Sequence, residues 1–139
     1  MATAPTQPVD PQTIKTLWVE SVGRLMDQIS NWLSAHPTHP RIERTEFNCV
    51  EHNLGAYVAP GVEAEFDSGT IIVQPIGRNY PKNGIVQVQA WPTLRKIRLI
   101  HERDPHTPWT VLTDSRVPLR QEWNAENFII LVNDLLDQE

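Results

Sequence analysis

The chain has 139 residues, of which 40% are hydrophobic and 21% are charged, and its formal net charge is −5 at pH 7. This composition fits one globular domain and excludes the collagen-like, disulfide-dense and compositionally disordered classes. The negative charge excludes a global electrostatic attraction to nucleic acid or to an anionic membrane, so any such contact must be local.

The N-terminal stretch, residues 1–9, is small, polar and proline-containing, which predicts a disordered tail before a single domain over 10–139. It lacks the basic and apolar regions of a secretory signal, and no apolar run elsewhere approaches the about 20 residues of a membrane span. The one cysteine, Cys49, cannot form an internal disulfide. These features favour a cytoplasmic protein.

An amphipathic helix is predicted to begin at Asp10, which can cap it, with Pro11 in the first helical position. Apolar residues then recur at spacings of three and four: Ile14, Leu17, Trp18, Val22, Leu25, Ile29, Trp32 and Leu33. We expect this stripe to face the core of the domain. The alternative is a helix that pairs with the same helix of a second copy.

The helix is expected to end near Ala35, because His36 precedes a proline and such a residue is displaced from the helical region. His39 also precedes a proline, and in extended backbone the two imidazoles would start about 9 Å apart. Zinc needs its ligand nitrogens within about 2.1 Å. We therefore interpret this segment as a helix stop with exposed histidines. A metal site would need a tight turn and completion by Glu43 or Glu46.

From Arg44 to Leu119 the pattern changes to short alternating runs, which predicts an antiparallel sheet. Strands are expected at 44–51, 56–59, 62–66, 70–76, 85–91, 94–101, 109–113 and 117–119. Most breaks between them are short enough for hairpins, so consecutive strands should be neighbours in a meander. The Pro-Gly pair at 60–61 is interpreted as one of these turns.

The alternation also predicts which face of the sheet is buried. Within 62–66 apolar side chains alternate with Glu63 and Glu65, and residues 86–90 repeat the pattern with glutamines. One face should therefore be buried and the other wet. The two glutamates could instead form an acid–base or metal pair, but no partner residue is identifiable, so we favour a solvated face. The less regular segment 94–101 predicts a central strand covered in part on both sides.

A second helix is predicted near the C-terminus. Asn124 can cap it, Glu126 lies in the first turn, where the helix dipole favours an anion, and Trp123 and Phe128 occupy the positions of a hydrophobic staple. Apolar residues then repeat at helical spacing: Phe128, Leu131, Val132, Leu135 and Leu136. The predicted fold class is α+β: an N-terminal amphipathic helix, an antiparallel meander of about seven strands, and a C-terminal helix packed on one sheet face.

Cys49 and His52 resemble a nucleophile and base, but an offset of three along a strand places them on opposite faces. The same alternation aligns Cys49 with Phe47, so we interpret the cysteine as a small buried residue. No catalytic residue is assigned. Asp104 and His106 are the remaining acid–base candidates, because an aspartate can orient an imidazole that titrates near neutral pH.

The two longest connections, 77–84 and 102–108, are separated by one hairpin, so they should emerge at the same edge of the sheet, roughly 10 Å apart. Long loops at one edge often carry binding residues. The candidate ligand-binding set on this rim is Arg78, Tyr80, Lys82, Arg103 and His106, with His101 at the adjoining strand end.

Positive charge gathers near the same rim. Residues 78–103 hold six basic residues against one acidic residue, whereas residues 122–139 hold five acidic residues and no basic one. The basic segment could clamp a phosphate or carboxylate through arginine. The interpretation we favour is pairing with an acidic helix, or with Glu63 and Glu65. Nucleic acid is disfavoured, since the segment lacks interleaved aromatic residues.

These observations favour a small binding or accessory protein that is not an enzyme and acts through protein–protein or anionic-ligand contacts. A second copy of the chain is one expected partner, because five tryptophans in a short chain suit an interface core. One alternative is a small hydrolase or transferase acting on an anionic substrate at the 77–84/102–108 rim. Another is a carrier of an apolar small molecule between sheet and helix. No motif predicts a metal or a cofactor, and neither nucleic acid nor a membrane is an expected partner.

Overall fold

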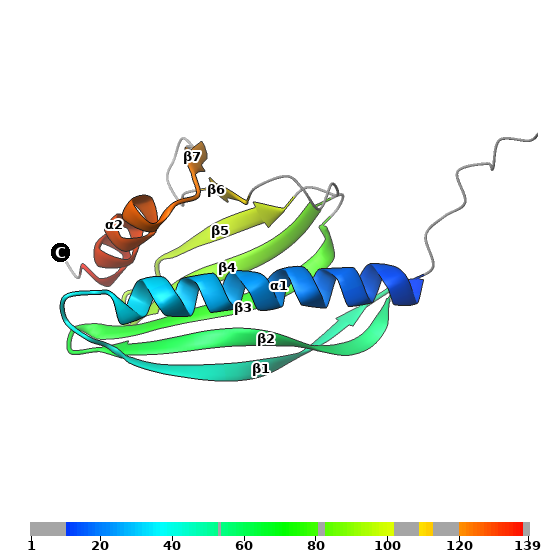
Figure 1. Cartoon of the computed structure of the whole chain (residues 1–139), viewed down its shortest axis with the longest axis horizontal. Helices are drawn as coiled ribbons and strands as arrows, with labels where there is room; N and C mark the ends of the chain where they lie inside the picture. Colours follow the sequence, from blue (N-terminus) through cyan, green and yellow to red (C-terminus); the bar gives the residue numbers. More distant parts are fainter. Residues whose placement is uncertain (1–10, 53, 81–82, 102–108, 113–119, 138–139) are drawn as a thin grey trace, which may run out of the picture.

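The computed structural model describes residues 11–52, 54–80, 83–101, 109–112 and 120–137. A long helix opens the chain, an antiparallel sheet follows with its strands side by side in sequence order, and a second helix closes it. Both helices lie on the same side of the sheet (Figure 1). The predicted α+β class, with a helix at each end of an antiparallel meander, is confirmed.

Helix α1 spans Pro11–Ser34 and helix α2 spans Ala125–Leu136. The strands are β1 (Arg41–Glu51), β2 (Gly55–Phe66), β3 (Gly69–Tyr80), β4 (Asn83–Trp91), β5 (Lys96–His101), β6 (Thr110–Leu112) and β7 (Arg120–Glu122). Strands β1 to β5 form the bulk of the sheet, because β6 and β7 have only three residues each.

The predicted break at 60–61 is wrong, since both residues lie inside the single strand β2. Pro60 pairs with Glu46 and Gly61 with Thr45 in an uninterrupted ladder with β1. Proline lacks an N–H to donate, which is tolerated where a strand has a free side. The ladder between β2 and β3 begins only at Val62, so Pro60 breaks none of its bonds.

The predicted loop at 77–84 is also wrong, because β3 continues to Tyr80 and β4 begins at Asn83. The ladder between these strands shifts register twice, between Pro75 and Gly77 and between Gly77 and Tyr80. Such shifts absorb extra residues on one strand without ending the pairing. The turn residues of this segment therefore mark bulges rather than a long connection.

The core lies between the helices and one face of the sheet. From α1 it takes the predicted stripe, including Trp18, Leu25 and Ile29, so this stripe faces the core, as expected. Helix α1 packs most extensively on β2, where Ala59 and Ala64 are fully buried. The alternation expected over 86–90 is confirmed, since its apolar residues are fully buried on the same face.

The two helices meet through an aromatic cluster. The Trp32 ring of α1 lies 4.9 Å from Trp123 and 5.7 Å from Phe128, measured between ring centroids. Trp123 and Phe128 are 5.3 Å apart, which confirms the predicted staple. Asn124 caps α2 as predicted, because its side chain accepts the Asn127 N–H at 2.8 Å.

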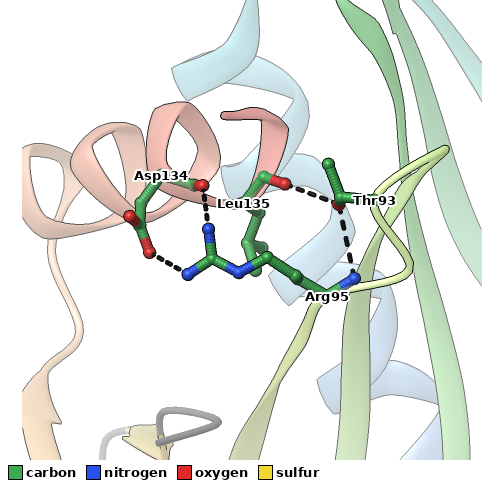
Figure 2. Close-up of polar contacts among 4 residues, drawn as sticks. All are labelled: Thr93, Arg95, Asp134 and Leu135. Carbon is green, nitrogen blue, oxygen red and sulfur yellow. Dashed lines mark hydrogen bonds and ion pairs between the residues drawn. The ribbon is translucent and has the colours of Figure 1, made fainter. Parts of the chain in front are cut away.

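The turn between β4 and β5 is tied to the C-terminal end of α2 (Figure 2). Arg95 donates to the Asp134 carbonyl at 2.6 Å and to its carboxylate at 2.8 Å. Thr93 donates to the Leu135 carbonyl at 2.7 Å. A helix leaves its last carbonyls without internal partners and favours a cation beside them. Arg95 is therefore paired with the acidic helix, one of the two partners expected for the basic segment.

The predicted strand at 94–101 begins later, at Lys96. Leu94 has a φ of 64° and lies in the turn, which follows a cis bond between Trp91 and Pro92. Within β5 the buried residues are Ile97, Leu99 and His101.

Candidate functional site

The ends of β3 and β5 lie at one edge of the sheet, as the rim prediction required. Tyr80 pairs with Asn83, and Gly84 pairs with His101 two strands from β3. The last residue of β1, Glu51, and the first residue of β2, Gly55, pair with each other at the same edge. We call this edge the hairpin end.

Part of the predicted rim lies outside the described residues: Lys82, Arg103, Asp104 and His106, and the side chain of Tyr80. Arg78 lies on β3 with a partly buried side chain. The ligand-binding role of this set stays a prediction. What the fold brings together at the hairpin end is a group that the sequence pattern did not single out.

That group is centred on Glu51, the last residue of β1, which is 8% exposed. Its carboxylate accepts a short hydrogen bond from the Tyr57 hydroxyl. Both of its oxygens lie 3.0 Å from the Arg78 backbone nitrogen. Trp18 of α1 donates to the Tyr57 hydroxyl at 3.1 Å. One buried carboxylate thus links the β1–β2 hairpin to β3 and, through Tyr57, to the first helix.

The signal for this cluster was present but incomplete. The alternation that aligned Cys49 with Phe47 also assigns Glu51 to the buried face when it is extended by one more step. Nothing in the local pattern shows that Tyr57 and Arg78 would satisfy that carboxylate. Their contacts span 6 and 27 residues and depend on sheet register.

Burial raises the pKa of the Tyr57 hydroxyl, and the hydrogen bond to the Glu51 carboxylate raises it further. A tyrosine whose pKa is raised in this way keeps its hydroxyl proton in the folded state at pH values where the same tyrosine in the unfolded chain has already lost it. The stabilising effect is complete below the ordinary tyrosine pKa of about 10 and is lost as pH rises through the higher folded-state value.

We therefore expect the free energy of unfolding to fall by about 1.4 kcal/mol for each pH unit above about pH 10. Tyr57→Phe should remove this slope, because phenylalanine cannot titrate. Urea unfolding at several alkaline pH values measures it. An equal alkaline slope in the variant would mean that another group is responsible.

Cys49 is 7% exposed, which confirms the prediction of a small buried residue. Its thiol donates to the Phe47 carbonyl at 3.8 Å, and burial raises its pKa. A thiol with a raised pKa holds its proton at neutral pH and is a poor nucleophile. His52 is exposed beyond the end of the strand.

Aromatic rings line the helix side of the hairpin end. His101 is buried and stacks on Trp109, with ring centroids 4.5 Å apart and planes at 19°. Trp109 lies 6.0 Å from Trp18. Gly84 gives Trp18 its space, because a side-chain carbon there would collide with the indole ring. The predicted neighbour of the rim, His101, is therefore a packed residue on the inner face.

A cleft of about 640 Å³ lies at the opposite end of the sheet. It is lined by His36, Thr38, Phe66, Asp67, Ser68, Asn133, Leu136 and Asp137. These residues come from the segment after α1, the β2–β3 turn and the end of α2. Among the residues that the structure describes, no group of three or more His, Cys, Asp or Glu side chains is arranged to hold a metal ion.

His36 corrects the expectation of exposed histidines, because it is only 5% exposed. The Thr38 backbone N–H donates to its Nδ1 at 3.2 Å, so Nε2 carries the proton and donates to Asn133 Oδ1 at 2.9 Å. His39 is exposed, but its φ of 50° shows a turn rather than extended backbone. The helix does end as predicted, at Ser34, and His36 joins that end to α2.

The face of the sheet opposite the helices is the third candidate surface. We define the open face as the helix-free side of β2 to β6, formed by Glu63, Glu65, Ile72, Gln74, Ile85, Gln87, Gln89, Lys96, Arg98, Ile100 and Leu112. Its isoleucines and its leucine are half-buried by their neighbours. Trp91 continues it at the end of β4 and is 59% exposed. The predicted wet face is therefore polar only in part.

The charges of the open face are segregated. Glu63 and Glu65 lie on β2, whereas Lys96 and Arg98 lie on β5, on the far side of two strands. None of these four side chains forms an ion pair with another described residue. The predicted pairing of the basic strand with Glu63 and Glu65 does not occur, because β3 and β4 separate them by about 14 Å.

Comparisons with known proteins return no match: no family model, no curated protein and no solved structure resembles this chain. Within the described residues, no helix is both long enough and apolar enough to cross a membrane.

Proposed function

We propose that this protein is a non-catalytic binding or accessory module that acts through protein–protein contacts on the open face of its sheet. The observation that best supports this proposal is the composition of the open face. Among the described residues, no helix covers this face, and it combines Ile72, Ile85, Ile100 and Leu112 with uncharged glutamines and with charges at its sides that form no ion pair.

Apolar side chains on a solvent-facing sheet favour this proposal for an energetic reason. Water-facing sheet surfaces are normally polar, and contiguous apolar patches on soluble proteins tend to mark binding sites. Ile85 and Ile100 are directly paired across β4 and β5, and Leu112 lies on the adjoining strand. Covering these three side chains would remove apolar surface from water, and each Å² removed would stabilise the complex by about 25 cal/mol.

The hairpin end supports a structural role for its buried groups. The Glu51 carboxylate is occupied by Tyr57 and Arg78, and the raised pKa of Cys49 leaves that thiol protonated. The predicted anionic-ligand rim, and with it the hydrolase or transferase alternative, depends on residues outside the described ones. The carrier alternative is disfavoured, because side chains with no exposed surface fill the layer between α1 and the sheet.

The test replaces Ile85 and Ile100 together with threonine, which keeps the β-branched shape suited to a strand. We expect the amount of partner protein captured from an extract of the native cells to fall at least about tenfold, which is about 1.4 kcal/mol of binding free energy. Quantitative mass spectrometry of proteins retained by the immobilised chain measures it.

The matched control is Leu17→Gln, which removes an apolar side chain that is 49% exposed on α1, on the other side of the molecule. It should leave capture unchanged. Equal capture by wild type and the Ile85/Ile100 variant, with thermal unfolding confirming that both are folded, would contradict the proposal.

A further inference from the structure

We infer that the partner that fits the open face is a second copy of this chain, bound face to face about a two-fold axis parallel to the strands. This inference rests on the proposed function and names its partner. The supporting observation is the distribution of charge across the sheet. Acidic residues of one copy face basic residues of the other under only one orientation of the two-fold axis.

The ladder registers align the relevant side chains in one row. Glu63 pairs with Ile72, Ile72 with Gln89, and Gln89 with Lys96. The row therefore runs from an acidic residue on β2, through an apolar and a polar residue, to a basic residue on β5. Glu65 extends the acidic side along β2, in the row of Thr70, whereas Arg98 extends the basic side along β5 in the opposite direction, in the row of Gln87.

A two-fold axis parallel to the strands, between β3 and β4, lays β2 of one copy over β5 of the other. Glu63 of each copy then faces Lys96 of its partner, and Ile72 faces Gln89. Arg98 lies next to Lys96 on the same face, within reach of the same glutamate. Because such an interface is isologous, each charged pair is formed twice.

An axis perpendicular to the strands is disfavoured by the same row. It would lay β2 over β2 and β5 over β5, so that acidic side chains meet acidic ones and basic meet basic. Juxtaposed like charges across an interface cost several kcal/mol. The face thus selects one orientation and disfavours the other.

Within the part of the chain that the structure describes, these four charges have no ion-pair partner in one copy, which supports the inference. Three other ion pairs are formed within the described residues: Arg41 with Glu43, Arg44 with Asp27, and Arg95 with Asp134. Glu63, Glu65, Lys96 and Arg98 are left outside these pairs. Glu63 also lies directly opposite Glu43 on β1, an unfavourable cross-strand pair that a facing cation would relieve.

The area is sufficient for a specific dimer. The five strands of the open face, spaced about 4.8 Å apart over about seven residues at about 3.3 Å each, present about 550 Å² per copy. Two copies would bury about 1,100 Å², above the about 1,000 Å² expected of a biological interface. Two sheets can pack face to face about 10 Å apart with their strands within about 30° of parallel.

The experiment is sedimentation equilibrium of the full chain and of two charge-reversed variants. One carries Glu63→Lys with Glu65→Lys, and the other carries Lys96→Glu with Arg98→Glu. Wild type should be a dimer, and each variant alone should self-associate at least about tenfold more weakly, because its two sides then carry the same sign. An equal mixture of the variants should form a heterodimer, and a chain with all four reversals should dimerise again.

Two further measurements keep the test decisive. Glu20→Lys with Glu126→Lys makes the same change in net charge on the helix side, at exposed positions, and should leave the dimer intact. If a charge-reversed variant fails to fold, Glu63→Gln with Glu65→Gln replaces it, and dimerisation by this variant should be weaker and less sensitive to added salt than that of wild type.

A monomeric wild type, or variants whose dimerisation is unchanged in isolation, would overturn the inference. So would a mixture of folded variants that fails to associate. The proposed function fails separately. If wild type is monomeric but the Ile85/Ile100 variant still loses capture of another protein, the open face is a binding surface for a different partner. If neither property responds to changes on the open face, both proposals fall.

Discussion

Replacing Glu51 with leucine should lower the free energy of unfolding by about 3 to 5 kcal/mol, measured by urea denaturation at neutral pH. Leucine is close in size to glutamate, so the loss does not come from a cavity. It comes from buried polar groups that lose their acceptor: the Tyr57 hydroxyl and the Arg78 backbone N–H. A buried donor left without an acceptor costs about 1 to 3 kcal/mol.

Glu51→Gln separates charge from hydrogen bonding. Its amide oxygen can still accept from one of the two donors, so the expected loss is smaller, about 1 to 2 kcal/mol. In the Tyr57→Phe background, Glu51→Leu should cost less than in wild type, because one orphaned donor is already absent. An additive double variant would show that Glu51 and Tyr57 contribute no coupling energy. A Glu51→Leu variant as stable as wild type would show that the carboxylate contributes no net stability.

Gly84→Ala should destabilise the protein by about 3 kcal/mol, because the added methyl group occupies the space of the Trp18 indole. The Trp18 ring cannot easily move aside. It is 2% exposed, its Nε1 is hydrogen-bonded to Tyr57, and Trp109 lies beside it. Displacing Trp18 would therefore also disturb the buried cluster. Thermal and urea unfolding give the size of the effect.

A smaller residue at position 18 provides the control for this steric explanation. Trp18→Leu alone should cost about 3 kcal/mol by leaving a cavity, but Gly84→Ala added to it should cost less than it does in wild type. A coupling energy above about 1 kcal/mol supports steric conflict as the cause. If both changes are simply additive, the cost of alanine at position 84 has an origin other than the indole ring.

The buried cluster and the open face lie on opposite sides of one sheet. The cluster therefore affects association at the open face only indirectly. Glu51 joins β1, β3 and, through Tyr57, α1, so it fixes the hairpin end on the helix side. A rigid sheet presents its other face in a fixed shape, which lowers the entropic cost of association. The stability variants described above therefore report on the scaffold and not on the partner.

The two helices were predictable from the sequence because their signals are local. Apolar spacing, a proline in the first helical position and an Asn cap act over one or two turns, and the structure reproduces them at Pro11 and Asn124. The sheet order was predictable for a related reason, since short connections leave consecutive strands no choice but to lie side by side. The burial of Cys49 followed from alternation alone.

Where a local turn signal in the sequence conflicted with strand pairing, the structure follows the strand pairing. Pro60 and Gly61 favour a turn by themselves, but eleven residues of β1 pair with β2 and hold them extended. The segment 77–84 has the composition of a loop, and bulges admitted it into β3 and β4. These outcomes depend on neighbouring strands, which a local window of sequence cannot contain.

The candidate surfaces depended most on tertiary structure. From the sequence, His36 was expected to be exposed just after the end of a helix. In the structure its ring is hydrogen-bonded to Asn133, which is 97 residues away. The sequence by itself determined the helices, the strand order and the alternation that puts Glu63 on the wet side. It did not assign a face to Lys96 or Arg98, because the segment 94–101 was predicted to be covered in part on both sides. Only the register of four strands decided that these charges stand at opposite ends of one row, because a slip of one residue would turn every side chain of a strand to the other face.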